Sequence, residues 1–187
     1  MAEIVENRQE NKMSEMMNEH SRLQEFTIQP ARLCQLDQIL DMYSRARQFM
    51  AEHNNPTQWP ADYPSRDMVA DDIEAGFMFA CMDGQELAAV FYYRAGEEPD
   101  YENIRDGCWL NQEPYGVVHR ITTGGGRRGA GSFCLNWAWR QCGNLKIDTH
   151  RDNAVMQNLL KKNGFQYCGI IRGRDGGERL AYQKEKP

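Results

Sequence analysis

The stretch VVHRITTGGGRRGAGSFCLNWAW, residues 117–139, passes from an apolar segment through a glycine-rich loop into a helical pattern. The segment YGVVHRITT, 115–123, predicts a β-strand, and the apolar spacing over residues 130–142 predicts an α-helix. Glycines between a strand and a helix leave backbone N–H groups open at the positive end of the helix dipole. The loop is therefore typical of a phosphate site, and Arg127 and Arg128 add positive charge to it.

The loop's own residues leave more than one interpretation open. Gly124, Gly126 and Gly129 have the G-x-G-x-x-G spacing of a dinucleotide-binding loop, and Asp148 lies near the end of the next predicted strand. Too little chain follows Asp148 for a doubly wound parallel sheet, which weighs against a dinucleotide. No Lys-Ser or Lys-Thr follows the glycines, which excludes a Walker loop. A glycine-rich turn without a ligand is the remaining alternative.

The rest of the chain alternates strand and helix patterns. We expect further strands at 26–30, 77–83, 86–93, 145–150, 165–173 and 178–185, and further helices at 33–52, 65–76 and 151–164. Ser65 is the expected N-cap of one helix, and Asp152 or Asn153 that of the last. The order β-α-α-β-β-β-α-β-α-β-β predicts an α/β or α+β fold, in which a mixed sheet carries helices on its faces.

The composition indicates a single globular domain. Apolar residues make up 41% of the 187 and charged residues 26%, enough for a hydrophobic core without disulfides. Residues 1–24 are polar, so we expect an N-terminal extension followed by one domain over residues 25–187. No apolar run approaches the roughly 20 residues that span a bilayer, and the N-terminus lacks a signal-peptide pattern. We therefore expect a cytoplasmic protein without a membrane partner.

The net charge and the cysteine spacing argue against two kinds of partner, nucleic acid and metal ions. The net charge of −5 makes nucleic acid an unfavourable partner. The six cysteines are scattered, with no CxxC pair and no histidines at metal-ligand spacing, so we expect free thiols and no metal. A homodimer is compatible with the sequence.

Two motifs resemble those of a known family. GRRGAG, residues 126–131, is similar to the glycine loop of the GCN5-related N-acetyltransferases (GNAT), and NAVMQNLLKKNGF, residues 153–165, is similar to their fourth helix. Gly126 departs from the first motif, where the family usually has Gln or Arg. The resemblance covers about residues 26–184 and implies the GNAT fold. In that fold about four helices flank a mixed sheet of about seven strands, which is splayed at the strand that binds the cofactor.

The resemblance also implies acetyl-CoA as the co-substrate. Its pyrophosphate would lie on the N–H groups of Arg127 to Ser132, its pantetheine arm would run along Ile121–Thr123, and Asn153 would contact the arm. The implied cofactor-binding residues are Ile121, Thr122, Thr123, Gly126, Arg127, Arg128, Gly129, Ala130, Gly131, Ser132 and Asn153.

The reaction implied by the resemblance is direct attack of a primary amine on the thioester within a ternary complex. Many relatives carry a tyrosine as general acid seven residues after the helix-four asparagine, and this chain has Leu160 there. The candidates for acid or base work are therefore His119, Asp148 and His150. Each also has a structural interpretation, as a side chain bonded within the sheet or at the next helix.

Trp59 and Tyr63, within QWPADYP, are the candidate acceptor-binding residues, because an aromatic wall suits an amphipathic or cationic group. The acidic run of residues 97–102 could attract an amine or lie in solvent. We expect an N-acetyltransferase that acts on a small-molecule amine. A non-catalytic CoA-binding sensor and, behind it, a dinucleotide-dependent oxidoreductase are the alternatives.

Overall fold

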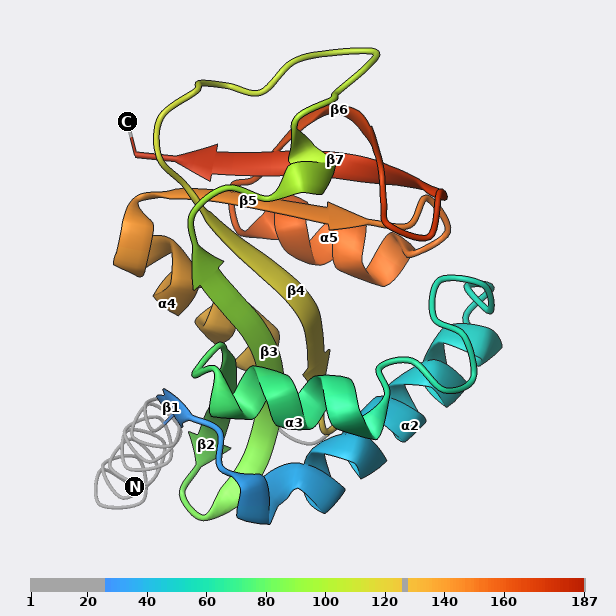
Figure 1. Ribbon diagram of the computed structural model, residues 1–187, viewed down its shortest axis with the longest axis vertical. Coiled ribbons are helices and arrows are strands. Elements are labelled where there is room, and N and C mark those ends of the chain that lie inside the picture. The colour runs from blue at the N-terminus through green and yellow to red at the C-terminus, as the bar shows by residue number, and fades with distance from the viewer. Residues whose placement is uncertain (1–25, 126–127, 187) are drawn as a thin grey trace, which may run out of the picture.

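A seven-stranded mixed sheet organises the chain, whose computed structural model describes residues 26–125 and 128–186 (Figure 1). The strands are β1 (Phe26–Pro30), β2 (Met78–Asp83), β3 (Glu86–Ala95), β4 (Gly116–Thr123), β5 (Asn144–Thr149), β6 (Gln166–Arg172) and β7 (Glu178–Glu185). The helices are α2 (Leu36–Glu52), α3 (Arg66–Glu74), α4 (Ala130–Cys142) and α5 (Ala154–Lys162), with 3-10 turns η1 (Leu33–Gln35) and η2 (Pro99–Tyr101). This order confirms the predicted succession of elements and the fold class.

The sheet changes character between β4 and β5. Strands β1 to β4 form an antiparallel meander, whereas β4 and β5 are parallel and pair only at Gly116 with Leu145 and at Val117 with Lys146. Beyond Val117 the two strands diverge, as Figure 1 shows. The predicted splay at the cofactor-binding strand is therefore present. It leaves the β5-facing edge of the remaining β4 residues without a partner among the described strands.

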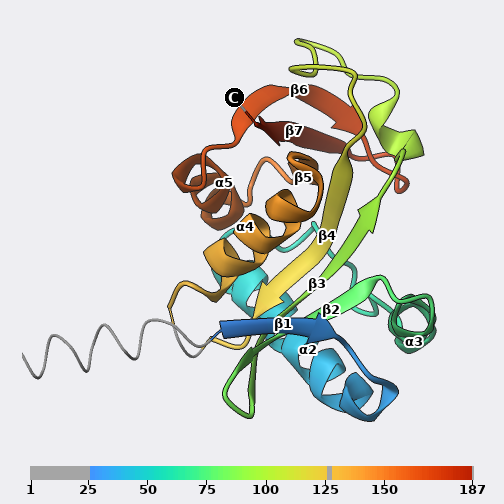
Figure 2. The same cartoon turned by 90° about the vertical axis from the view of Figure 1, so that its left-hand side faces the viewer.

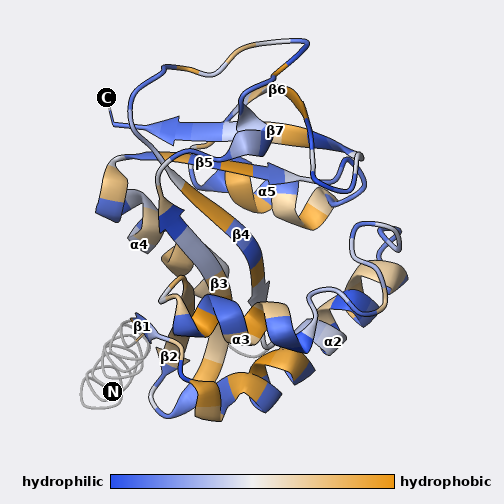
Figure 3. Ribbon diagram, in the orientation of Figure 1, coloured by the Kyte–Doolittle hydropathy of each residue, from blue (hydrophilic) through white to orange (hydrophobic). Residues whose placement is uncertain are grey.

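Helices cover both faces of the sheet (Figure 2). Helices α4 and α5 pack on one face, where Cys134, Leu135 and Leu160 belong to one buried cluster with Phe91 and Ile147. Helices α2 and α3 pack on the other face against β2 and β3. The connection between β3 and β4 covers that second face beside β6 and β7. Apolar and polar residues alternate along α2, as expected for a helix with one buried side (Figure 3).

The two predicted N-caps agree with the structure. Ser65 caps α3 by accepting a hydrogen bond from the backbone N–H of Met68 at 3.2 Å, and Asn153, rather than Asp152, caps α5. Gly143 ends α4 with a φ of 71°, a left-handed conformation that glycine adopts without strain. Among the helices that the structure describes, none is long and apolar enough to cross a membrane.

Candidate active site

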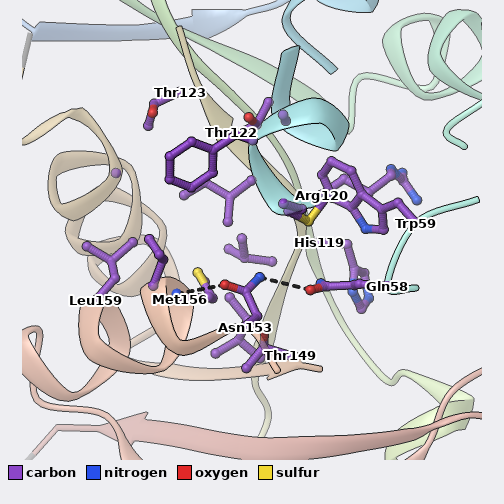
Figure 4. A pocket seen from close by; sticks show the side chains of 18 of the residues that line it. Gln58, Trp59, His119, Arg120, Thr122, Thr123, Thr149, Asn153, Met156 and Leu159 are labelled. Carbon is purple, nitrogen blue, oxygen red and sulfur yellow. Dashed lines mark hydrogen bonds between the residues drawn. The ribbon is translucent and has the colours of Figure 1, made fainter. Parts of the chain in front are cut away.

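A cavity of about 420 Å³ opens where β4 and β5 diverge. Its walls come from β4, the carboxyl end of β5, the second half of α2 and the first turns of α5. Figure 4 shows Trp59, His119 and Arg120 toward one end of this cavity and Met156 and Leu159 toward the other. The divergence of the two strands therefore produces a pocket that joins residues far apart in the sequence.

Five of the predicted cofactor-binding residues line this cavity: Ile121, Thr122, Thr123, Gly131 and Asn153. The Asn153 side chain already has a partner at each end. Its Oδ1 accepts from the backbone N–H of Met156 at 2.9 Å, and its Nδ2 donates to Gln58 Oε1 at 2.8 Å (Figure 4). Asn153 thus joins the start of α5 to the connection between α2 and α3.

The other predicted cofactor-binding residues lie around the start of α4. Gly126 and Arg127 lie outside the described residues. Arg128 is exposed, Ala130 is buried, and the Ser132 hydroxyl accepts a hydrogen bond from Asn163 Nδ2 at 3.0 Å. Gly129 precedes α4 with a φ of 100°, a conformation that requires glycine. Arg128, Gly129, Ala130 and Ser132 do not line the cavity, and their contacts with a cofactor stay a prediction.

His119 lines the cavity and is held by a carboxylate that was not among the predicted site residues. His119 Nε2 lies 3.1 Å from Glu98 Oε2, and the Glu98 side chain is only 3% exposed. The hydrogen bond with His119, together with Arg174, whose guanidinium lies 3.2 Å from Glu98 Oε1, lowers the pKa of Glu98 to about 2. Because an ionised carboxylate only accepts hydrogen bonds, Nε2 carries the proton and Nδ1 is left free to accept one.

Asp148 lies on the other side of the same imidazole. Asp148 Oδ1 is 3.8 Å from His119 Nδ1 and accepts a hydrogen bond from the hydroxyl of Tyr101 at 2.7 Å. Burial and the nearby Asp148 carboxylate raise the pKa of Tyr101 well above its usual value, so this hydroxyl remains a donor. A separation of 3.8 Å is too long for a direct hydrogen bond and leaves room for a ligand atom that bonds to both groups.

His150 does not join this group. Its Nδ1 accepts from the backbone N–H of Asp152 at 3.3 Å and lies 3.5 Å from the Asp152 carboxylate. The structure therefore brings Asp148 together with His119 and Tyr101, and it places His150 at the turn before α5.

The two predicted acceptor-binding residues lie together but differ in access to the cavity. Trp59 lines the cavity and packs edge-on against Tyr43, with ring centroids 5.7 Å apart. Tyr63 packs behind Trp59 at 6.0 Å, and its hydroxyl accepts from Arg120 at 3.4 Å. Ala46, Phe49 and Met50 of α2 line the same cavity, so this wall is largely apolar.

A bulge in β4 sets the direction of these side chains. Val90 pairs with Thr122 and Tyr92 pairs with His119, so two residues of β4 lie opposite Phe91 alone. Arg120, at the bulge, has a φ of 49°, which is a strained conformation for a residue other than glycine. Arg120 is held there by an ion pair with Asp72, and its carbonyl accepts from the Tyr43 hydroxyl at 3.0 Å.

The alternation along the strands assigns the site residues to different faces of the sheet. On β5, Ile147 belongs to the cluster beneath α4 and α5, and Thr149 shares that face. Asp148 points the other way, toward Tyr101 and His119. Because the cavity is lined by residues of both faces, it connects the α4–α5 face to the face that carries His119.

Solved structures of known proteins share this fold. An acetyltransferase of the GNAT family from Streptococcus agalactiae is 32% identical, with a TM-score of 0.77, and the match covers 88% of this chain and 97% of that one. A putative acetyltransferase from Staphylococcus aureus is 22% identical, with a TM-score of 0.62 and coverage of 85% and 98%. A putative acetyltransferase from Salmonella typhimurium, solved with acetyl-CoA, is 14% identical, with a TM-score of 0.58 and coverage of 87% and 94%. No protein-family model and no curated protein sequence matches the chain.

The fold, the two motifs and this similarity lead to one family. Among the described strands only β4 and β5 pair in parallel, so the sheet is not the doubly wound sheet that the dinucleotide interpretation requires. The similarity to the Streptococcus agalactiae structure extends over nearly all of that protein. The chain belongs to the GNAT family of acetyltransferases.

Proposed function

We propose that the chain transfers an acetyl group from acetyl-CoA to the primary amine of a small molecule, by direct attack within a ternary complex. The observation that carries this proposal is the position of His119. Its imidazole lines the cavity at the β4–β5 split, bonds through Nε2 to the buried Glu98, and leaves Nδ1 3.8 Å from Asp148. Such an arrangement can bind an ammonium group and remove a proton from it.

The residues around the split fit coenzyme A. Within residues 26–125 and 128–186, the β5-facing edge of β4 beyond Val117 has no strand partner, so its backbone groups are available to the amides of a pantetheine arm. Thr149 contributes a buried hydroxyl that has no hydrogen-bond partner in the described parts of the chain. Ile121, Thr122 and Thr123 would hold the arm, and the N-terminus of α4 would hold the phosphates. When bound, acetyl-CoA supplies an acetyl group activated as a thioester.

His119 acts as the general base in this proposal. An alkyl ammonium cannot attack a thioester until it loses a proton, and His119 Nδ1 is the free acceptor for that proton. Glu98 fixes the ring and stabilises the imidazolium that forms, because its carboxylate is ionised and buried beside Nε2. Asp148 attracts the ammonium to the opposite side of the ring.

The proton for the departing thiolate comes from the same imidazole in this proposal. Leu160 is fully buried in the apolar cluster beneath α4 and α5, and its side chain has no group that could donate a proton. After His119 has accepted the amine proton, it is the acid that lies in the cavity. The C–N bond forms as the C–S bond breaks, and His119 passes the first amine proton to the departing sulfur. His119 then accepts the second proton from the new amide nitrogen and releases it to water, so the products are the amide, the free thiol of CoA and one proton.

The test combines binding with turnover. We expect acetyl-CoA, and not NAD or NADP, to raise the Tm of the protein. A panel of small primary amines, including arylalkylamines that suit Trp59, is then assayed for thiol release from acetyl-CoA. A tertiary amine of the same skeleton, which cannot form a stable amide, is the matched control for each hit. Binding of CoA without thiol release on any amine would favour the sensor alternative over the enzyme.

A further inference from the structure

Thr149 ends β5 with a hydroxyl group that no described residue of the chain satisfies. The residue is 1% exposed, and its Oγ1 has no hydrogen-bond partner within residues 26–125 and 128–186. Folded proteins pair nearly all of their buried hydroxyl groups, since an unpaired one costs free energy. The exception at Thr149 therefore needs a reason.

The position of this hydroxyl supplies the reason. Thr149 lines the cavity together with Asn153, Met156 and Leu159, and its side chain is drawn among theirs in Figure 4. Because Thr149 shares the face of Ile147, it lies on the α4–α5 side of the split and not on the side of His119. The unpaired hydroxyl therefore belongs to the part of the cavity that the cofactor would fill.

The neighbouring asparagine does not compete for this role. Both polar atoms of the Asn153 side chain are bonded within the protein, one to the backbone N–H of Met156 and one to Gln58. Thr149 is thus the side chain of this wall that still has an unused donor and acceptor. The Thr149 Oγ1 atom has less than 1 Å² of exposed surface, so a ligand amide at this wall would bond to it after the side chain rotates toward the cavity, and this rotation would break no hydrogen bond within the described residues.

We infer that the Thr149 hydroxyl is a binding group for the pantetheine arm of coenzyme A. This inference rests on the proposed function and adds to it a residue that neither glycine-loop nor helix-four motif contains. The arm carries two amide groups, each with an N–H and a C=O, and either can complete the hydrogen bonding of a hydroxyl. Thr149 is a binding residue here, with no part in the transfer of protons.

Substitution of Thr149 by Val tests the inference, because Val has the same shape and lacks the hydroxyl. Isothermal titration calorimetry measures CoA binding to the wild type, T149V and T149S. We expect the Kd for CoA to rise about 2- to 10-fold in T149V, the loss of one neutral hydrogen bond, and to stay near the wild-type value in T149S. The Kd for adenosine 3′,5′-bisphosphate, the nucleotide end of CoA without the arm, should be the same in the wild type and T149V.

The Tm of the ligand-free protein is a second measurement. In T149V the affinity for CoA should fall, whereas this Tm should not fall. Removal of an unpaired buried hydroxyl leaves no partner unsatisfied, so the Tm of ligand-free T149V should equal or exceed that of the wild type. A lower Tm with an unchanged Kd for CoA would show a structural hydroxyl and overturn the inference. An equal loss of affinity for both ligands would also overturn it, since the arm would not be the group recognised. Failure of CoA to bind the wild type would instead overturn the proposed function itself.

Discussion

Glu98, a buried carboxylate in the β3–β4 connection, pairs with the imidazole of His119 on strand β4, with 3.1 Å between Oε2 and Nε2. Arg174, from the turn between β6 and β7, binds the second oxygen of the same carboxylate at 3.2 Å. Glu98 therefore holds the His119 ring through Nε2. The other ring nitrogen, Nδ1, lies on the side of the cavity and of Asp148.

His119→Ala should lower kcat by about 100-fold or more, as expected for the loss of a general base, while the Kd for CoA stays unchanged. Glu98→Gln, which keeps an oxygen that can accept from Nε2 but removes the charge, should lower kcat by a smaller factor. Steady-state kinetics and calorimetric titration with CoA measure the two quantities. Wild-type kcat in His119→Ala would remove the imidazole from the proton path.

Gly129→Val should abolish CoA binding. The φ of 100° at Gly129 is unfavourable for a branched residue by about 1–2 kcal/mol or more, and the side chain would project at the start of α4, where the phosphates are expected. Gly76→Val is the matched control, since Gly76 has a φ of 75° and nothing within 4 Å of an added Cβ. Both variants should lose stability in thermal denaturation. CoA binding by Gly129→Val at wild-type affinity would contradict the assignment of the loop.

Asn153→Ala should destabilise the fold by about 1 kcal/mol through loss of the α5 cap. Gln58→Ala leaves the cap in place but removes two bonds that Gln58 Oε1 accepts, one from Asn153 Nδ2 at 2.8 Å and one from Asn55 Nδ2 at 2.7 Å. Both variants lose the bond between Asn153 and Gln58, so their difference compares the cap with the bond from Asn55. We expect the smaller loss in Gln58→Ala. Urea denaturation of both variants measures the difference, and an equal loss would show that the cap contributes no more than the bond from Asn55.

Lys146 should make stability depend on pH above neutrality. Its ammonium group lies over the rings of Tyr115 and Trp109 at 3.8 and 4.4 Å, and burial lowers its pKa to about 8. The unfolded chain, with a lysine pKa of about 10.4, binds more protons than the folded chain between these values, so the free energy of unfolding should rise from pH 8 to about pH 10. Lys146→Met should lack this contribution. Identical pH profiles of the two proteins would exclude it.

Much of the fold follows from local pattern. The helix caps at Ser65 and Asn153 and the left-handed end at Gly143 depend on residue types at fixed offsets, so the sequence predicts them. The order of strands and helices follows from apolar periodicity. The prediction that β4 splays apart from β5 rests on the family resemblance instead, since no residue pattern within either strand indicates where their pairing stops.

The site itself could be predicted only in part. His119 and Asp148 were candidates because their residue types suit proton transfer, but their partners depend on how a long connection folds back. Glu98 lies within an acidic run, and nothing in the run distinguishes the carboxylate that becomes buried from those that stay in solvent. Tyr101 and Thr149 carry no sequence signal for their roles, because contacts between distant elements decide them.

The short pairing of β4 with β5 has an evolutionary consequence. The two walls of the cavity come from different elements. One wall, formed by β4, α4 and α5, would bind acetyl-CoA, and the other, formed by α2 and residues 53–65, would surround the entering amine. Changes of sequence in the second wall can alter which amine is chosen while the first wall is inherited intact. A graft of residues 53–65 between relatives that keeps Gln58, the partner of Asn153, would then exchange acceptor preference and leave affinity for coenzyme A unchanged.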